Sequence, residues 1–176
     1  MKPAQKILEQ KILPPPETKL QLLKNVIERL TDNERYIYIG MDHFARAQDE
    51  LVLAQRNKTL QRNFQGYSTH ANADIYAFGM SAISQIPDAY WQNEKDLLKY
   101  YAALDAGKVP LSRGYIVSDE DKIRRDTIMR FMCDLGLDYA AMSNRLGIHF
   151  ASHFEREIES LAAFEADGLV RRSENG

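Results

Sequence analysis

Side chains suited to ligand chemistry gather between residues 62 and 83, where the chain reads RNFQGYSTHANADIYAFGMSAI. Phe64 and Tyr67 carry flat rings that could stack on a flat group, and Gln65 offers a donor and an acceptor to a polar ligand edge. Gly66 would let the backbone approach a ligand closely. The same residue types also pack tight corners, so the pattern leaves ligand binding and packing both open.

A second candidate is the pair Asp42 and His43, which follows a strand-like run at residues 36–39. Strand ends are where α/β folds place functional side chains. Together the carboxyl and imidazole groups could orient a ligand or move a proton. They could equally cap the next helix and hydrogen-bond across a loop, and the sequence does not decide between these hypotheses.

Metal binding is less favoured. His149 and His153 are four residues apart, which on a helix puts both on one face, a spacing that can hold zinc. No cysteine or carboxylate motif completes the set, and Phe150 and Phe154 indicate that His149 stands at a helix start, so a capping or solvent-exposed role is favoured. Cys133 is the single cysteine, and an iron–sulfur cluster usually takes three or four thiolates.

Composition narrows the class of protein further. The formal net charge of −2 offers no general attraction to nucleic acid or to an anionic membrane. One cysteine cannot close an internal disulfide, and the start of the chain has no apolar run of signal-peptide length, so we expect a cytoplasmic protein. No uncharged apolar run reaches the roughly 18 residues of a membrane span.

The first third predicts a helix that leads into a strand. Residues 1–13 could form a short helix or a loose arm, and prolines at 14–16 end it. Apolar spacing then predicts a helix from Glu17 to Leu30, followed by a strand at residues 36–39. A lone strand leaves its edges unsatisfied. The unit is therefore expected to be cut from a larger sheet or barrel, and such a strand could pair two copies of an otherwise monomeric chain.

The rest of the chain predicts a mainly α-helical fold with minor β-structure. Helices are expected at residues 48–60 and 93–106, with a hairpin or loop at 109–117. On the second of these helices the side chains expected to face the core are Leu97, Leu98, Tyr101 and Leu104.

The last third predicts three helices. The first begins at Ser118, a plausible N-cap with Asp121 three residues on, and ends at Gly136. Its expected apolar face is formed by Ile128, Phe131, Met132 and Leu135.

A short helix then carries Tyr139, Met142 and Leu146 inward and ends at Gly147, before a longer helix from Phe150 to Phe164. With a strand starting at Leu169 and Val170, these helices would form a winged helix with an incomplete wing.

The third helix carries Glu155, Glu157 and Glu159 against Arg156, so it would repel phosphates. No nucleic-acid partner is therefore expected. A winged-helix regulatory or interaction module remains an alternative function.

Several runs closely resemble a known enzyme family. They are YIGMDHFAR (38–46), RNFQGYSTHA (62–71), GMSAIS (79–84), IRRDTIMRFMCDLGLDY (123–139) and DGLV (167–170). All resemble oxygen-independent coproporphyrinogen III oxidases, in order and over nearly the whole chain. A haem-chaperone-like branch of the radical S-adenosylmethionine (SAM) proteins is the alternative relative, but it usually differs at the first two runs.

The resemblance implies a radical SAM barrel with a CxxxCxxC cluster motif, followed by a largely helical C-terminal domain. Residues 1–47 would be the end of that barrel and residues 48–176 a C-terminal domain truncated in the wing. The implied activity of the full-length enzyme is oxidative decarboxylation of coproporphyrinogen III to protoporphyrinogen IX in haem synthesis. It uses SAM, a [4Fe-4S] cluster and an electron acceptor. This chain carries none of the cluster cysteines, so we expect no catalytic residue in it and no activity alone.

The resemblance also implies binding residues. Family members hold a second SAM, and the positions that match its contacts are Phe64, Gln65 and Ile83. Charge complementarity separately suggests basic residues that could bind the propionates of the substrate. These candidates are His43, Arg46, Arg62 and Arg113.

Overall fold

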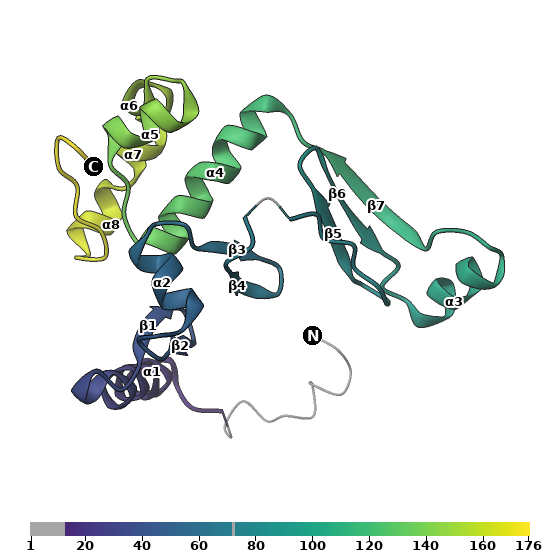
Figure 1. The fold of residues 1–176 in the computed structure, drawn as a ribbon, viewed down its shortest axis with the longest axis horizontal. Coiled ribbons are helices and arrows are strands. Elements are labelled where there is room, and N and C mark those ends of the chain that lie inside the picture. Colours follow the sequence, from purple (N-terminus) through teal and green to yellow (C-terminus); the bar gives the residue numbers. More distant parts are fainter. Residues whose placement is uncertain (1–12, 72) are drawn as a thin grey trace. The chain divides into compact units, whose positions relative to one another are not determined.

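The computed structural model describes residues 13–71 and 73–176. The chain forms two compact units, one reaching to Leu53 and the other running from Ala54 to Gly176. Figure 1 shows helices as the main element of both units, with short antiparallel strands between them. The predicted class, mainly α with minor β, is therefore confirmed.

The first unit opens with helix α1 (Pro16–Thr31), as the apolar spacing predicts. Pro16 stands in the first turn, where the missing N–H group has no intrahelical partner to lose. Asp32 ends the helix, and a 3-10 turn (Asp32–Glu34) with a left-handed Asn33 redirects the chain. The arm expected at residues 1–13 falls, except for residue 13, outside the described residues.

The predicted strand of the first unit is not alone. Strand β1 (Ile37–Gly40) pairs with strand β2 (His43–Ala45) as an antiparallel hairpin. The expectation of an unpaired strand was wrong because the partner is only three residues long, too short to stand out in the sequence. Ile39 and Ala45 are buried, and the rings of Tyr38 and Phe44 lie 5.3 Å apart across the pair. That residues 1–47 end a barrel stays a prediction.

Helix α2 (Glu50–Arg56) is shorter than the predicted 48–60. The chain turns at Lys58, whose backbone is left-handed, and strand β3 (Gln61–Asn63) begins three residues later. Strand β4 (Gly66–Ser68) pairs with β3 in an antiparallel hairpin.

A three-stranded sheet follows in the second unit. Its order is β5 (Ile83–Ile86), β6 (Ala89–Asn93) and β7 (Leu111–Ile116), all antiparallel. Only β7 coincides with a sequence expectation, the hairpin or loop at residues 109–117. Helix α3 (Leu97–Asp105) connects β6 to β7 at one end of the sheet, and the chain leaves the other end towards α4 (Figure 1).

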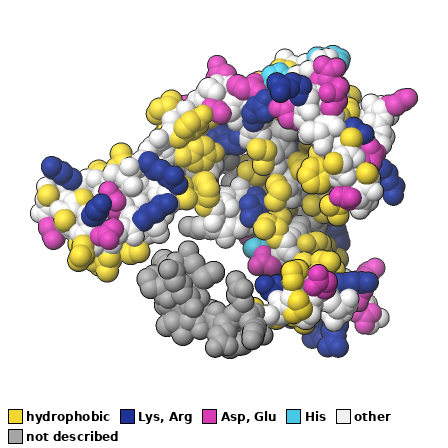
Figure 2. Space-filling model, turned by 180° about the vertical axis from the view of Figure 1, so that it is seen from behind, with side chains coloured by type: hydrophobic (Ala, Val, Ile, Leu, Met, Phe, Trp, Pro, Cys, Tyr) yellow, Lys and Arg dark blue, Asp and Glu magenta, His cyan; other side chains and the backbone are white. Residues whose placement is uncertain are grey.

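The expected core face of α3 was wrong. Leu97, Leu98, Tyr101 and Leu104 are all exposed, Leu98 to 80%. Figure 2 shows hydrophobic side chains at the surface of the lobe formed by this helix and its sheet. The apolar residues do recur at helical spacing along α3, but no other part of the described chain buries the face that they form.

Helix α4 (Asp119–Asp134) begins as predicted. The Ser118 hydroxyl accepts a hydrogen bond from the Asp121 N–H at 3.1 Å, and the Asp121 carboxylate accepts one from the Ser118 N–H at 2.9 Å. The helix ends at Asp134, and its C-cap Leu135 is left-handed, one residue before the stop predicted at Gly136.

The predicted apolar face of α4 was wrong at three of its four residues, since only Met132 is half-buried. Ile128, Phe131 and Leu135 are exposed, whereas the helix buries Arg130 and Cys133.

In residues 139–166 the expected apolar core forms, but the predicted long helix is interrupted. Helix α5 (Tyr139–Leu146) ends at a left-handed Gly147, as expected. The helix predicted from Phe150 to Phe164 is divided into three pieces, α6 (Phe150–His153), α7 (Glu155–Ser160) and α8 (Ala162–Ala166).

Met142, Phe150 and Phe154 form the core of this segment. Leu169 and Val170 lie in irregular backbone, so the predicted strand there was wrong.

Candidate functional site

Phe64 and Gln65 form the two-residue turn of the β3–β4 hairpin. Asn63 pairs with Gly66 across the turn, and the Asn63 side chain accepts a hydrogen bond from the Gln65 N–H at 2.8 Å. Gly66 has a φ of 135°, which L side chains rarely adopt. The Phe64 ring is 62% exposed. The turn thus presents an aromatic ring and an amide side by side.

Helix α4 holds this hairpin in place. The Arg62 N–H donates to the Met129 sulfur at 3.0 Å, and the Tyr67 hydroxyl donates to the Met132 carbonyl at 3.4 Å. Arg130 is 4% exposed and donates to the carbonyls of Lys58, at 2.7 Å, and Leu60. The helix therefore holds both the segment that leads into β3 and the backbone of β3 itself.

The turn also meets the three-stranded sheet. The Phe64 ring packs edge-on against Tyr90 of β6, with centroids 6.1 Å apart. Tyr90 pairs with Gln85 of β5, and Ile83 lies two residues before Gln85, so all three share one face of the sheet. Phe64 thus contacts the sheet face on which Ile83 also lies.

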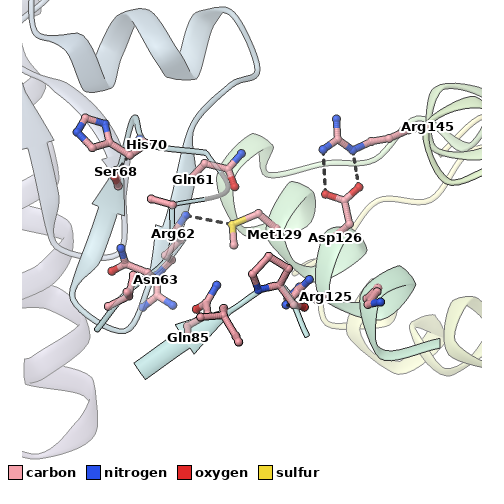
Figure 3. A pocket seen from close by; sticks show the side chains of 15 residues that line it. Gln61, Arg62, Asn63, Ser68, His70, Gln85, Arg125, Asp126, Met129 and Arg145 are labelled. Carbon is pink, nitrogen blue, oxygen red and sulfur yellow. Dashed lines mark hydrogen bonds and ion pairs between the residues drawn. The ribbon is translucent and has the colours of Figure 1, made fainter. Parts of the chain in front are cut away.

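A cavity of about 470 Å³ opens between β3, β5 and α4 (Figure 3). Asp126 and Arg145 face one another at its rim, with Nη2 of Arg145 2.9 Å from a carboxylate oxygen. The other basic side chains at this cavity come from different elements. They are Arg62, His70, Lys122 and Arg125.

A second cavity, of about 460 Å³, adjoins the first. Arg62, Arg125 and Met129 line both. The remaining lining is more apolar and aromatic. It includes Tyr90, Tyr115, Val117, Ile128 and Met132. The two cavities thus place a basic region beside an apolar one.

Ion pairs and hydrogen bonds shift several pKa values near the cavities. A hydrogen bond and the charge of Lys122, 2.8 Å away, lower the pKa of Asp88, and the same pair raises the pKa of Lys122. Hydrogen bonds from Ser118, and one from the Tyr115 hydroxyl, lower the pKa of Asp121. These contacts also attach the sheet to α4.

The described residues do not fit an iron–sulfur cluster. Cys133 is buried on α4, and burial raises the pKa of its thiol, whereas a cluster takes several thiolates. In the described ranges, no three His, Cys, Asp or Glu side chains gather as metal ligands. His153 instead lies 3.0 Å from Glu120, and His149 occupies the N-cap of α6.

The predicted substrate-binding residues are divided between the two units. His43 and Arg46 belong to the first unit, where the His43 imidazole lies 2.8 Å from the Asp42 carboxylate and Arg46 is exposed. Arg62 belongs to the second unit and lines both cavities. Arg113 donates to the Gln92 side chain at 3.1 Å.

Arg125, Met129 and Tyr90 carry no signal strong enough to mark them as binding residues in the sequence. One signal existed: Arg125 and Met129 are four residues apart within IRRDTIMR, so a helix carries both on one face.

Among the helices of the described residues, none is long and apolar enough to cross a membrane.

The family model described as HemN C-terminal domain matches residues 117–176. These residues are therefore similar to a HemN C-terminal domain. Over nearly its whole length the chain is similar to the C-terminal portion of oxygen-independent coproporphyrinogen III oxidases.

The curated relatives quantify this similarity. The Synechocystis oxidase is 41% identical over 180 residues, which cover 100% of this chain and 38% of that protein. The Escherichia coli oxidase is 44% identical over 173 residues, which cover 98% of this chain and 38% of that protein. The chain thus spans about two fifths of the length of these relatives.

A solved structure agrees. Coproporphyrinogen III oxidase (HemN) from E. coli, described as a radical SAM enzyme, matches with a TM-score of 0.88 and 43% identity. The match covers 98% of this chain and 40% of that one.

Proposed function

We propose that this chain is the C-terminal part of an oxygen-independent coproporphyrinogen III oxidase that works in the cytoplasm. The observation that supports this most is the match to the E. coli enzyme, at a TM-score of 0.88 over 98% of the chain. The proposed reaction converts two propionates of coproporphyrinogen III to vinyl groups, with loss of carbon dioxide. SAM and a [4Fe-4S] cluster supply the radical chemistry, and an electron acceptor takes the remaining electrons.

In this proposal the chain supplies binding groups rather than the cluster. Its only cysteine is buried, and burial raises the pKa of the thiol, so we assign the cluster thiolates to the rest of the enzyme. The hairpin turn contributes Phe64 and Gln65 to a SAM molecule. The exposed Phe64 ring offers a stacking surface, and the Gln65 amide can hydrogen-bond to the polar edge of the ligand. Ile83, on the sheet face that Phe64 reaches through Tyr90, adds an apolar contact.

The proposal can be tested in cells with a hybrid enzyme. The hybrid is the E. coli oxidase in which the region matched here is replaced by this chain. It is expressed in a bacterial strain that lacks its own coproporphyrinogen oxidases, and anaerobic growth without haem is measured. We expect growth to be restored. A hybrid that accumulates as a folded protein, shows the absorption of its cluster and still fails to support growth would contradict the proposal.

A further inference from the structure

Two arginines at the cavities have no carboxylate partner among the described residues. Nε of Arg62 is buried and donates to no hydrogen-bond acceptor within residues 13–71 and 73–176. Nη1 of Arg125 donates to the Pro87 carbonyl at 3.0 Å and to the Tyr90 hydroxyl at 3.3 Å, and both acceptors are neutral. The charge of each guanidinium is therefore unneutralised by a direct ion pair.

The other cations beside these arginines are already paired. Arg145 makes two hydrogen bonds to Asp126, and Lys122 lies 2.8 Å from Asp88. Arg125 also helps to lower the pKa of Asp88, but that carboxylate accepts its hydrogen bond from Lys122. The excess positive charge of the first cavity thus belongs to Arg62 and Arg125.

A carboxylate is the ligand that this arrangement favours. A buried polar atom without a hydrogen bond costs free energy, and an unpaired buried charge costs more. A guanidinium offers a planar fork of donors that matches a carboxylate, and such charge-assisted bonds are stronger than neutral ones. Arg62 comes from β3 and Arg125 from α4, so their charges converge on one cavity from two sides (Figure 3).

The apolar second cavity restricts the chemical class of the ligand further. Arg62, Arg125 and Met129 stand at the border of both cavities, and Tyr90 and Met132 lie on the apolar side. A small hydrophilic anion would leave those side chains unused. A ligand with an apolar ring system and a carboxylate at its edge would fill both regions, since the polarizable Met side chains adapt to ring surfaces.

We propose that Arg62 and Arg125 bind one carboxylate of an amphipathic, ring-containing polycarboxylate whose apolar body lies over Met129 and Met132. This inference rests on the proposed function only in naming the ligand class, a tetrapyrrole held by a propionate. It assigns to Arg125 a role in substrate binding, and it makes the HemN C-terminal domain part of the substrate site.

The test uses the whole chain and coproporphyrin III, a stable porphyrin with four carboxylates, as the probe. Trp91 is the single tryptophan of the chain and lies on β6 next to Tyr90, so quenching of its emission reports binding. Affinities are measured for the wild type, Arg62→Gln and Arg125→Gln. The matched control is Arg156→Gln, which changes an exposed arginine that lines neither cavity. Circular dichroism checks that each variant is folded.

We expect each cavity variant to weaken binding by roughly tenfold or more, as befits the loss of a charge-assisted hydrogen bond. Arg156→Gln should stay within about twofold. Arg125→Lys keeps the charge but not the fork, and should restore part of the affinity. Coproporphyrin tetramethyl ester should bind more weakly and respond to neither cavity variant.

The proposal is overturned if Arg62→Gln and Arg125→Gln bind coproporphyrin III as tightly as Arg156→Gln. It is also overturned if the ester binds as well as the acid, or if the wild-type chain shows no binding. Failure of the proposed function is distinguishable from these results. An inactive hybrid enzyme with intact, arginine-dependent carboxylate binding would reject the oxidase function and leave the site standing.

Discussion

Arg130 and Asp134 form an almost fully buried ion pair one turn apart on α4, with Nη1 3.3 Å from a carboxylate oxygen. The same guanidinium donates to the backbone carbonyls of Lys58 and Leu60. A charged side chain thus replaces the apolar contact that usually attaches a helix to a strand. It fixes the position of β3, and β3 carries Arg62 and the turn at Phe64.

Replacing Arg130 by methionine should destabilise the fold strongly. The change leaves Asp134 and two carbonyls buried without their donor, and breaking a buried pair typically costs about 3–5 kcal/mol of unfolding free energy. Urea unfolding followed by circular dichroism measures the loss. The exposed change Arg156→Met is the control, with an expected effect within about 0.5 kcal/mol. A loss under about 1 kcal/mol for Arg130→Met would show that the pair does not anchor the hairpin.

The capping box of α4 should make stability depend on pH. Hydrogen bonds from Ser118 and Tyr115 lower the pKa of Asp121 in the folded state. Its contribution is therefore fully present above the pKa of the unfolded chain, and is lost as pH falls through the lower folded pKa. Thermal midpoints between pH 7 and pH 3 should fall less steeply in Asp121→Asn than in the wild type, whereas Asp105→Asn should follow the wild type. Parallel curves for all three proteins would contradict this account.

Cys133 should be inert in the native protein. Burial raises the pKa of its thiol, and only the thiolate reacts readily with alkylating reagents. Mass spectrometry should find little iodoacetamide adduct in native buffer near neutral pH, and one adduct per chain after unfolding in urea. Labelling of the native chain as fast as that of the unfolded chain would show that the α4 surface around Cys133 is open.

The turn residues should determine how much SAM the hybrid enzyme holds. If Phe64 and Gln65 contact a second SAM, Phe64→Ala combined with Gln65→Ala should reduce bound SAM from about two molecules per hybrid to about one. Equilibrium dialysis with labelled SAM measures the stoichiometry. Phe78→Ala removes a ring that is 92% exposed and serves as the control. An unchanged stoichiometry in the turn variant would remove these residues from the SAM site.

Local signals in the sequence predicted local structure well. The Ser118–Asp121 box of α4 and the glycine after α5 both act within one helical turn. Their effect depends on neighbours in the chain, which the sequence displays directly. The start of α4 and the end of α5 were therefore foreseeable, whereas the early end of α2 and the division of the last helix were not. The prolines at 14–16 were predicted only to end regular structure, yet Pro16 begins α1.

Which face of a helix is buried was not foreseeable, because it depends on distant partners. The apolar stripe of α3 is exposed, while α4 buries Arg130, a residue type that is rarely buried unless paired. The three-stranded sheet was missed for the same reason. Its strands are short, and β6 and β7 pair across the intervening helix α3.

The residues of the candidate site were likewise only partly predictable from the sequence. Phe64, Gln65 and Arg62 stood out in the sequence because their types and their family resemblance pointed to binding. Arg125 looked like one charge in a surface helix, and only the fold shows that it meets Arg62 at one cavity.

The most direct test of the central claim is product formation by the purified hybrid enzyme under anaerobic conditions. Coproporphyrinogen III, SAM and an electron acceptor are supplied, and porphyrins are separated by chromatography after oxidation. The account predicts protoporphyrin IX, absent when SAM is omitted. A hybrid that is folded, contains its cluster and cleaves SAM, yet leaves coproporphyrinogen III unchanged, would contradict it.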